Sequence, residues 1–228
     1  MKTILLIWML GVNLAIAGDI TGTVRAQSKA PAATEGAAGG YDSRKYKFAE
    51  KINYDELRDF VVFIEGSFGT NLAPAPAALS VATRRIEQKG AAFYPHVLPL
   101  VVGSTVEWPN YDTIFHNVFS MSETKTFDLD IYKGNPPDKQ VTFDQAGRVD
   151  VFCSIHSSMN CVVLVLENPF FALSDAQGRY CISNVPPGKY SLKAWHERLP
   201  ARTVQITVPE TGEVKQDLTL GLKGAPRN

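Results

Sequence analysis

The sequence is 228 residues long, and its 23 lysine and arginine residues equal its 23 aspartate and glutamate residues, so the formal net charge is zero. A chain without an excess of positive charge has no field to hold a nucleic-acid backbone, and we exclude nucleic acid as a partner. The length is sufficient for two modest domains, each with a core of its own.

Residues 1–17 have the features of a secretory signal peptide. Lys2 precedes an apolar run that ends in Ala15-Ile16-Ala17, the small-x-small pattern that signal peptidase cleaves. We expect cleavage after Ala17 and a periplasmic or secreted mature protein. An uncleaved anchor is the alternative, but the run falls short of the roughly 20 apolar residues that span a bilayer. We therefore expect no membrane span in the mature chain.

The mature chain is expected to begin with a strand and a flexible segment, together residues 18–59. Residues 19–24 alternate between polar and apolar side chains like a strand, whereas residues 26–40 are rich in Ala, Gly, Pro, Ser and Thr and cannot bury apolar surface. A short helix is expected near residues 54–58. Residues 60–64 are β-branched and aromatic and predict a buried strand.

The strand pattern becomes dense after this point. The predicted strands are residues 97–102, 105–108, 127–132, 140–143, 148–152 and 162–166. The fifth of these strands leads directly into Cys153, and the sixth leaves the same loop as a fully apolar run. The loop therefore joins two core strands, and a site on it would be supported at both ends.

This loop, residues 153–159, is called the metal loop below. It contains three side chains of the types that bind metals, namely Cys153, His156 and Met159. A thiolate, an imidazole and a thioether together suit copper, and a His₂Cys set with a weak axial Met suits electron transfer. The second histidine is expected far upstream, and His116 is the obvious supplier because it follows an apolar segment and precedes Asn117. Zinc is a rival for Cys/His sites, but a thioether contributes little to Zn²⁺.

The other histidines and methionines have less support as ligands. His96 could approach the metal end of the domain, although we expect a polar loop residue there. His196, beside Trp195, is expected at the surface. Met121 could compete as the axial ligand, but it lies beyond His116 on a departing strand, and Met159 is favoured.

The chain has three cysteines, and an odd number in an oxidising compartment leaves one without a disulfide partner. A metal thiolate is one way to keep it. If Cys153 is a ligand, Cys161 and Cys181 remain as a candidate disulfide between the metal loop and the downstream segment. Two free buried thiols are the alternative.

Several of these motifs together resemble the cupredoxins, the plastocyanin- and amicyanin-like copper proteins, over residues 60–167. The matching pattern is Gly103-x-x-Val106-x-Trp108-x-Asn110, then His116-Asn117-Val118, then Cys153-x-x-His156-x-x-Met159. The resemblance implies an all-β fold with a Greek-key cupredoxin β-sandwich and one mononuclear type 1 copper centre.

By the same resemblance His116, Cys153 and His156 would be equatorial copper ligands and Met159 the axial ligand. Asn117 would tie the two ligand-bearing segments together. The sequence departs from the family in Ile155, where many members have Pro, and in the thiol of Cys161.

Residues 168–222 resemble a transthyretin-like or carboxypeptidase-regulatory-like β-sandwich, and residues 223–228 would be a tail. The matching strings are Gly178-Arg179-Tyr180 and Gly188-Lys189-Tyr190-Ser191-Leu192. Because this module is short for an independent domain, we expect it to pack against the cupredoxin sheet or to borrow the strand near residues 20–24. The arrangement is similar to periplasmic proteins called methylamine-utilisation-like.

Three functions compete at this stage. The first is a periplasmic one-electron carrier with transient redox protein partners. The second is copper delivery or storage, which is disfavoured because the mature chain lacks Met-rich or His-rich runs. The third is a β-sandwich binding module without metal. No enzyme is expected, because the sequence has no His-x-His pairs for a second copper centre and no serine triad that leaves His156 free.

Overall fold

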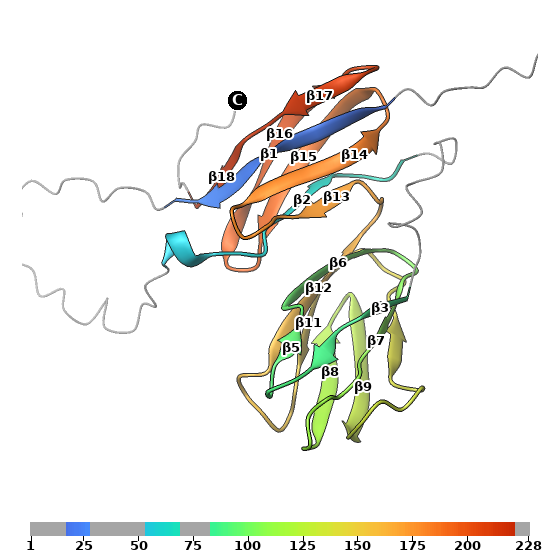
Figure 1. Ribbon diagram of the computed structural model, residues 1–228. Coiled ribbons are helices and arrows are strands. Elements are labelled where there is room, and N and C mark those ends of the chain that lie inside the picture. The colour runs from blue at the N-terminus through green and yellow to red at the C-terminus, as the bar shows by residue number, and fades with distance from the viewer. Residues whose placement is uncertain (1–16, 28–52, 69–82, 222–228) are drawn as a thin grey trace, which may run out of the picture.

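The computed structural model describes residues 17–27, 53–68 and 83–221, and it shows an all-β protein, which confirms the predicted fold class (Figure 1). In these ranges the helical content is one 3₁₀ turn, η1 (Tyr54–Glu56), close to the expected short helix. The predicted signal peptide up to residue 16, most of the predicted flexible segment and the tail lie outside the described residues.

Two β-sandwiches make up the described structure (Figure 1). The first sandwich contains β3 (Thr83–Arg85), β4 (Glu87–Gln88), β5 (Phe93–Tyr94), β6 (Val97–Val101), β7 (Thr105–Glu107), β8 (His116–Ser122), β9 (Lys125–Tyr132), β10 (Gln140–Thr142), β11 (Gly147–Phe152) and β12 (Asn160–Leu166). One sheet has the order β6-β12-β11-β8-β9, a second has the order β10-β7-β3, and β4 pairs with β5. This sandwich matches the dense strand pattern of the sequence.

The core of the first sandwich lies between its sheets. Trp108, Phe143 and Val118 are fully buried there, together with residues of β11 and β12 that alternate inward. Cys153 and Met159 belong to the same buried group. The metal loop is therefore anchored in the main core of this sandwich.

The second sandwich combines strands from both sides of the first in the sequence. Its strands are β1 (Gly18–Ala26), β2 (Val61–Ile64), β13 (Phe171–Leu173), β14 (Arg179–Val185), β15 (Gly188–His196), β16 (Leu199–Val208), β17 (Gly212–Lys215) and β18 (Leu218–Leu220). One sheet has the order β14-β1-β17 with β18 also paired to β1, and the other has the order β13-β2-β15-β16. The first sandwich is thus inserted in the chain between β2 and β13.

The C-terminal module does borrow the N-terminal strand, as expected. Ile20 pairs with Ile182 of β14 and with Val214 of β17, which places β1 inside its sheet. One expected boundary is wrong. The strand that was predicted to open the cupredoxin-like domain, β2, pairs instead with β13 and β15, through Phe63 with Phe171 and Ala194 with Val62.

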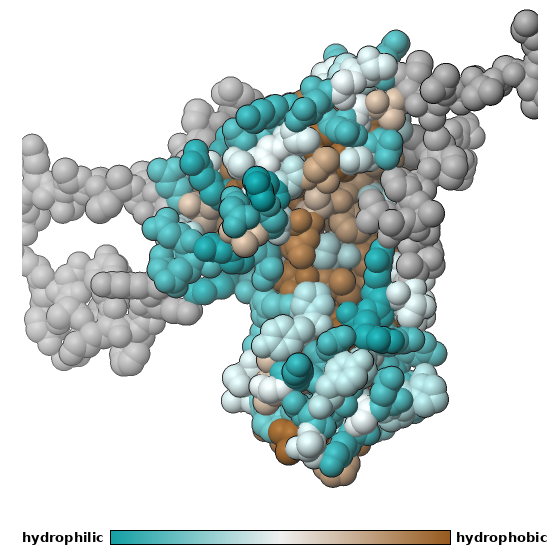
Figure 2. Space-filling view, in the orientation of Figure 1, coloured by the Kyte–Doolittle hydropathy of each residue, from teal (hydrophilic) through white to brown (hydrophobic). Residues whose placement is uncertain are grey.

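A separate group of buried apolar side chains joins the two sandwiches. Val97, Val162 and Leu164 come from the first sandwich, and Val61 and Phe171 come from the second. Figure 2 shows apolar surface at the level where the two halves meet. The outer face of β12, the strand that leaves the metal loop, is therefore covered by the second sandwich.

Within the described residues there is no helix with the length and hydropathy needed to cross a membrane.

Candidate metal centre

The structure brings together three side chains that the sequence singled out. His116 is the first residue of β8, while Cys153 and His156 lie in the loop between β11 and β12. One ligand atom from each residue lies within 4.8 Å of the other two. Nδ1 of His116 is 3.1 Å from Nδ1 of His156, and Sγ of Cys153 is 3.8 Å from the latter nitrogen.

These spacings fit a single transition-metal ion. Metal–nitrogen bonds of about 2.0–2.1 Å and metal–sulfur bonds of about 2.3 Å place two nitrogens about 3.3–3.6 Å apart and nitrogen and sulfur about 3.5–3.8 Å apart at trigonal to tetrahedral angles. The nitrogen–sulfur distance falls within its range, and the 3.1 Å between the two nitrogens is about 0.2 Å shorter than its range. A hydrogen bond between the two imidazole rings would also explain the 3.1 Å contact. It would not explain why the Cys153 thiol lies beside both rings.

A carboxylate orients the His116 ring. Asp112 Oδ2 lies 2.8 Å from Nε2 of His116, which is fully buried. The carboxylate also accepts hydrogen bonds from the backbone N–H groups of Gly90 and Ala91 at 2.7 and 2.9 Å. A proton on Nε2 leaves the lone pair of Nδ1 facing the other two ligand atoms, which is the tautomer a metal requires.

The same contacts set the ionisation of Asp112. The hydrogen bond from Ala91 N–H lowers the pKa of the Asp112 carboxyl, and those from His116 and Gly90 lower it further against the opposing effect of burial. The carboxylate is thus held in its charged form. The sequence analysis missed Asp112, because a spacing of four residues in a loop does not indicate which side chain faces a histidine.

Asn117 links the two segments that carry the ligands. Its backbone N–H donates to Sγ of Cys153 at 3.4 Å, and its side-chain oxygen accepts from Ser154 N–H at 3.4 Å. Its side-chain nitrogen donates to Asp128 at 2.7 Å, which fixes the orientation of the amide. The contacts with Cys153 and Ser154 hold the Cys153 side chain beside His116.

Met159 lies in the same loop and is buried in the core of the first sandwich. Its N–H donates to the carbonyl of His156 at 3.0 Å, and its carbonyl accepts from Cys153 N–H at 3.1 Å. These two bonds close the loop into a compact turn. Met121, the weaker axial candidate, is 76% exposed on β8.

The candidate disulfide is not formed, because all three cysteines are free. Cys161 is buried in the core of the first sandwich, whereas Cys181 is exposed on β14 of the second. The two thiols thus belong to different bodies, and only one of them is buried. Burial raises the pKa of the Cys161 thiol well above its ordinary value, with a further contribution from the negative charge of Asp150.

The remaining two histidines lie near the second sandwich, and neither belongs to the three-ligand cluster. His196 is buried against the Phe60 ring, with 4.9 Å between ring centroids, so the surface position expected for it is wrong. The ring lies at the end of β15 and packs on Phe60 of the second sandwich's own core, and this contact explains the burial. His96 lies in the short connection between β5 and β6 and contacts Glu197.

Exposed apolar side chains immediately precede the ligands in sequence. Ile114 and Phe115 precede His116 and are 46% and 57% exposed, and Ile155 precedes His156 and is 46% exposed. His156 itself is only partly buried, unlike His116. The cluster therefore meets the surface on the His156 side, among apolar side chains.

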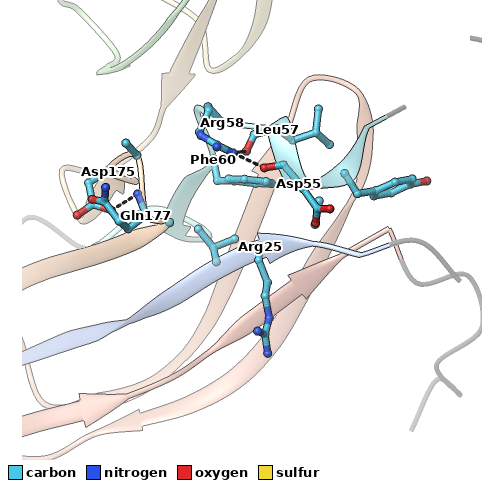
Figure 3. A pocket seen from close by; sticks show the side chains of 12 residues that line it. Arg25, Asp55, Leu57, Arg58, Phe60, Asp175 and Gln177 are labelled. Carbon is cyan, nitrogen blue, oxygen red and sulfur yellow. Dashed lines mark hydrogen bonds between the residues drawn. The ribbon is translucent and has the colours of Figure 1, made fainter. Parts of the chain in front are cut away.

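A different hollow lies in the second sandwich. This pocket of about 250 Å³ is bordered by β1, η1 and the turn before β14. Figure 3 shows Arg58 beside Asp55 and Leu57, whose backbone carbonyls accept hydrogen bonds from the guanidinium at 2.7 and 2.8 Å. The Arg58 guanidinium is thus already hydrogen-bonded to its own segment of chain. The pocket is therefore a weaker candidate for a functional site than the cluster of His116, Cys153 and His156.

Comparison with known proteins gives structural neighbours only, since no protein-family model and no curated protein matches the sequence. A purple cupredoxin from Nitrosopumilus maritimus is 25% identical over 36% of this chain and 98% of its own, with a TM-score of 0.31. A mutant of amicyanin in its oxidized state is 25% identical over 36% of this chain and 81% of its own, with a TM-score of 0.32.

A third neighbour is a Cu-containing nitrite reductase from Thermus scotoductus SA-01. It is 24% identical over 46% of this chain and 25% of its own, with a TM-score of 0.35. The case for a metal centre therefore rests on the positions of the ligand atoms in this chain.

Proposed function

We propose that the protein binds one copper ion in a mononuclear type 1 site and carries single electrons. The observation that carries the proposal is the convergence of His116, Cys153 and His156, with two nitrogens and one sulfur within 4.8 Å of one another. Thiolate and imidazole ligands suit copper, and a His₂Cys set is the arrangement used for electron transfer.

The proposal gives each residue a role. His116, Cys153 and His156 would hold the copper ion, and the thioether of Met159 would be a fourth, weaker ligand. Bound there, copper would supply one-electron chemistry between Cu(I) and Cu(II). Asn117 and Asp112 hold Cys153 and His116 in place through the hydrogen bonds described above, so the ligands need not move when the charge at the site changes.

The proposed partners are redox proteins that dock briefly at the apolar surface next to His156. Ile114, Phe115 and Ile155 are exposed there, and small interfaces of this kind support transient encounters. His156 is the least buried ligand of the three, so it is the shortest route from a docked partner to the site. The proposal further places the protein in the periplasm or outside the cell, after cleavage at Ala17.

Copper delivery or storage is the second candidate. A carrier that hands over its metal benefits from accessible ligands, whereas His116 and Cys153 are buried here. A binding module without metal would leave the convergence of three ligand side chains without a purpose. Both alternatives are therefore less well supported than electron transfer.

The deciding experiment is a copper titration of residues 18–228, followed by visible absorption before and after reduction. We expect an intense thiolate-to-copper band that disappears on reduction and is absent from Cys153→Ala. Cys181→Ala is the matched control, because this thiol is exposed in the other sandwich and the band should remain. Tight binding without the band would favour delivery or storage, and no uptake would exclude both copper functions.

A further inference from the structure

The turn between β15 and β16 reaches from the second sandwich to the first. Glu197, in this turn, has its carboxylate 2.9 Å from Nε2 of His96. The backbone carbonyl of Glu197 accepts a hydrogen bond from Arg148 of β11 at 3.0 Å. The Arg148 guanidinium also lies over the ring of Trp195, at 5.7 Å from its centre. The turn is thus fixed to the first sandwich at two separate points.

His96 connects the β15–β16 turn to the metal loop. Its Nδ1 lies 3.2 Å from the backbone carbonyl of Asn160, on the side of the ring opposite Glu197. Both partners are hydrogen-bond acceptors, so an imidazole that carries both protons can donate to each of them. The His96 carbonyl in turn accepts from Val162 N–H at 2.8 Å, which fixes the backbone of His96 against β12.

Asn160 is the residue that closes the metal loop. It directly follows Met159, and it pairs across the sheet with Phe152, which directly precedes Cys153. Its side-chain amide donates to the carbonyl of Ser158 at 3.1 Å. A restraint on Asn160 therefore acts on both ends of the loop that carries the ligands.

We propose that Glu197 and His96 are positioning residues through which the second sandwich holds the metal loop in its ligand-binding geometry. The second sandwich would then be part of the metal centre's support and not an independent binding module. The consequence at the metal rests on the proposed function, but the restraint on the loop is a property of the metal-free chain.

The apolar contacts between the sandwiches hold the two bodies together without Glu197 and His96. The positioning role of these two residues can therefore be tested separately. Val61, Phe171 and Leu164 are buried between the two bodies whether or not Glu197 contacts His96. Loss of the polar contact should therefore loosen the loop without separating the sandwiches. Precise ligand placement needs such a supporting contact, because a loop held only by its ends samples several geometries.

The test is amide hydrogen exchange in the metal-free chain at the N–H groups of Cys153 and Met159, which close the loop. In Glu197→Ala and His96→Ala we expect exchange at both amides to be about tenfold faster, because a charge-assisted hydrogen bond that restrains local opening is lost. Glu197→Gln retains an acceptor and should recover part of the protection. Glu65→Ala is the matched control, since it breaks a partly exposed ion pair with Lys193 inside the second sandwich.

The double variant Glu197→Ala/His96→Ala should exchange no faster than either single variant. Unchanged exchange in Glu197→Ala would overturn the proposal, as would equal acceleration in Glu65→Ala or an equal acceleration at Val163 in the core of β12. With copper bound, the second expected readout is a reduction potential that changes in Glu197→Ala and stays unchanged in the control Glu65→Ala. If the chain takes up no copper, the proposed function fails while the exchange result still decides the restraint.

Discussion

Asp112 and His116 form an ion-pair-like contact of 2.8 Å at a fully buried ring, and the carboxylate is fixed by two backbone N–H groups from the segment between β4 and β5. The contact settles which nitrogen of His116 faces the ligand cluster. Since the carboxylate is itself anchored, the ring cannot rotate without breaking several hydrogen bonds.

Asp112→Asn is expected to weaken metal binding by about 10- to 100-fold, because an amide supports the required tautomer less well than a carboxylate. Competition with a chelator of known affinity measures the change. Asp144→Asn provides the control, since Asp144 pairs with Lys125 at the surface and touches no ligand. Equal affinities for Asp112→Asn and the parent protein would show that the carboxylate does not orient the ring.

The Glu197–His96 contact should stabilise the fold most in mildly acidic solution. The side-chain hydrogen bond with Glu197 raises the pKa of His96, and the same contact lowers the pKa of Glu197. The stabilisation from His96 is complete below its unfolded pKa of about 6.5 and is lost as the pH rises through its folded value. That from Glu197 is present above its unfolded pKa of about 4.3 and is lost in acid.

A double-mutant cycle of Glu197→Ala and His96→Ala, measured by urea unfolding, should therefore give a larger coupling energy near pH 5.5 than near pH 8.5. Because both side chains are partly exposed, we expect only about 0.5–1 kcal/mol at the maximum. A coupling energy that is larger at pH 8.5 would contradict this assignment of charges.

Leu164 tests whether the two sandwiches unfold together. Its side chain is buried between them, so Leu164→Ala should cost about 2–5 kcal/mol and weaken the contact that couples the two bodies. We expect the parent protein to unfold in one transition and Leu164→Ala to unfold in two. Leu192→Ala, in the core of the second sandwich, should lower stability without splitting the transition. Coincident fluorescence and circular-dichroism curves for Leu164→Ala would count against coupling through this layer.

A side chain at Gly178 would be destabilising for two reasons, the positive φ and the close approach of another backbone segment. Comparison with Gly66 separates the two costs. It has a φ of +76°, and a Cβ there would lie 2.3 Å from the Val24 carbonyl oxygen of the neighbouring strand β1. Gly66 has a φ of +89° but no atom within 4 Å of such a Cβ. We expect Gly66→Ala to cost about 1 kcal/mol and Gly178→Ala about 3 kcal/mol in thermal unfolding. Equal costs would mean that β1 can move aside.

The sequence was most informative where local pattern alone decides the outcome. Residues 148–152 and 162–166 alternate or run apolar in ways that a strand requires, and both strands are present as β11 and β12. The short spacing from Cys153 to His156 nearly ensures that these side chains share one loop. His116 was the only partner that required a long-range guess, and the structure places it beside them.

Features that depend on pairing between distant segments could not be obtained in this way. The strand at residues 61–64 was recognised, but nothing in its apolar side chains indicates which sheet it joins. The candidate disulfide was inferred from the number of cysteines, although Cys161 and Cys181 lie in different sandwiches. Asp112 and Glu197 were missed, and His96 was considered without its partner, because each acts through a contact that only folding brings about.

The insertion of one sandwich within the other has a consequence for the order of events during synthesis. β1 and β2 are made first, but their partners β14, β15, β17 and β18 follow only after the whole first sandwich. The inserted sandwich can complete its own pairings while β1 still has open edges, because all strands of its sheets are consecutive in the chain. The open edges of β1 must therefore be kept from pairing with other chains until β14, β17 and β18 have been made.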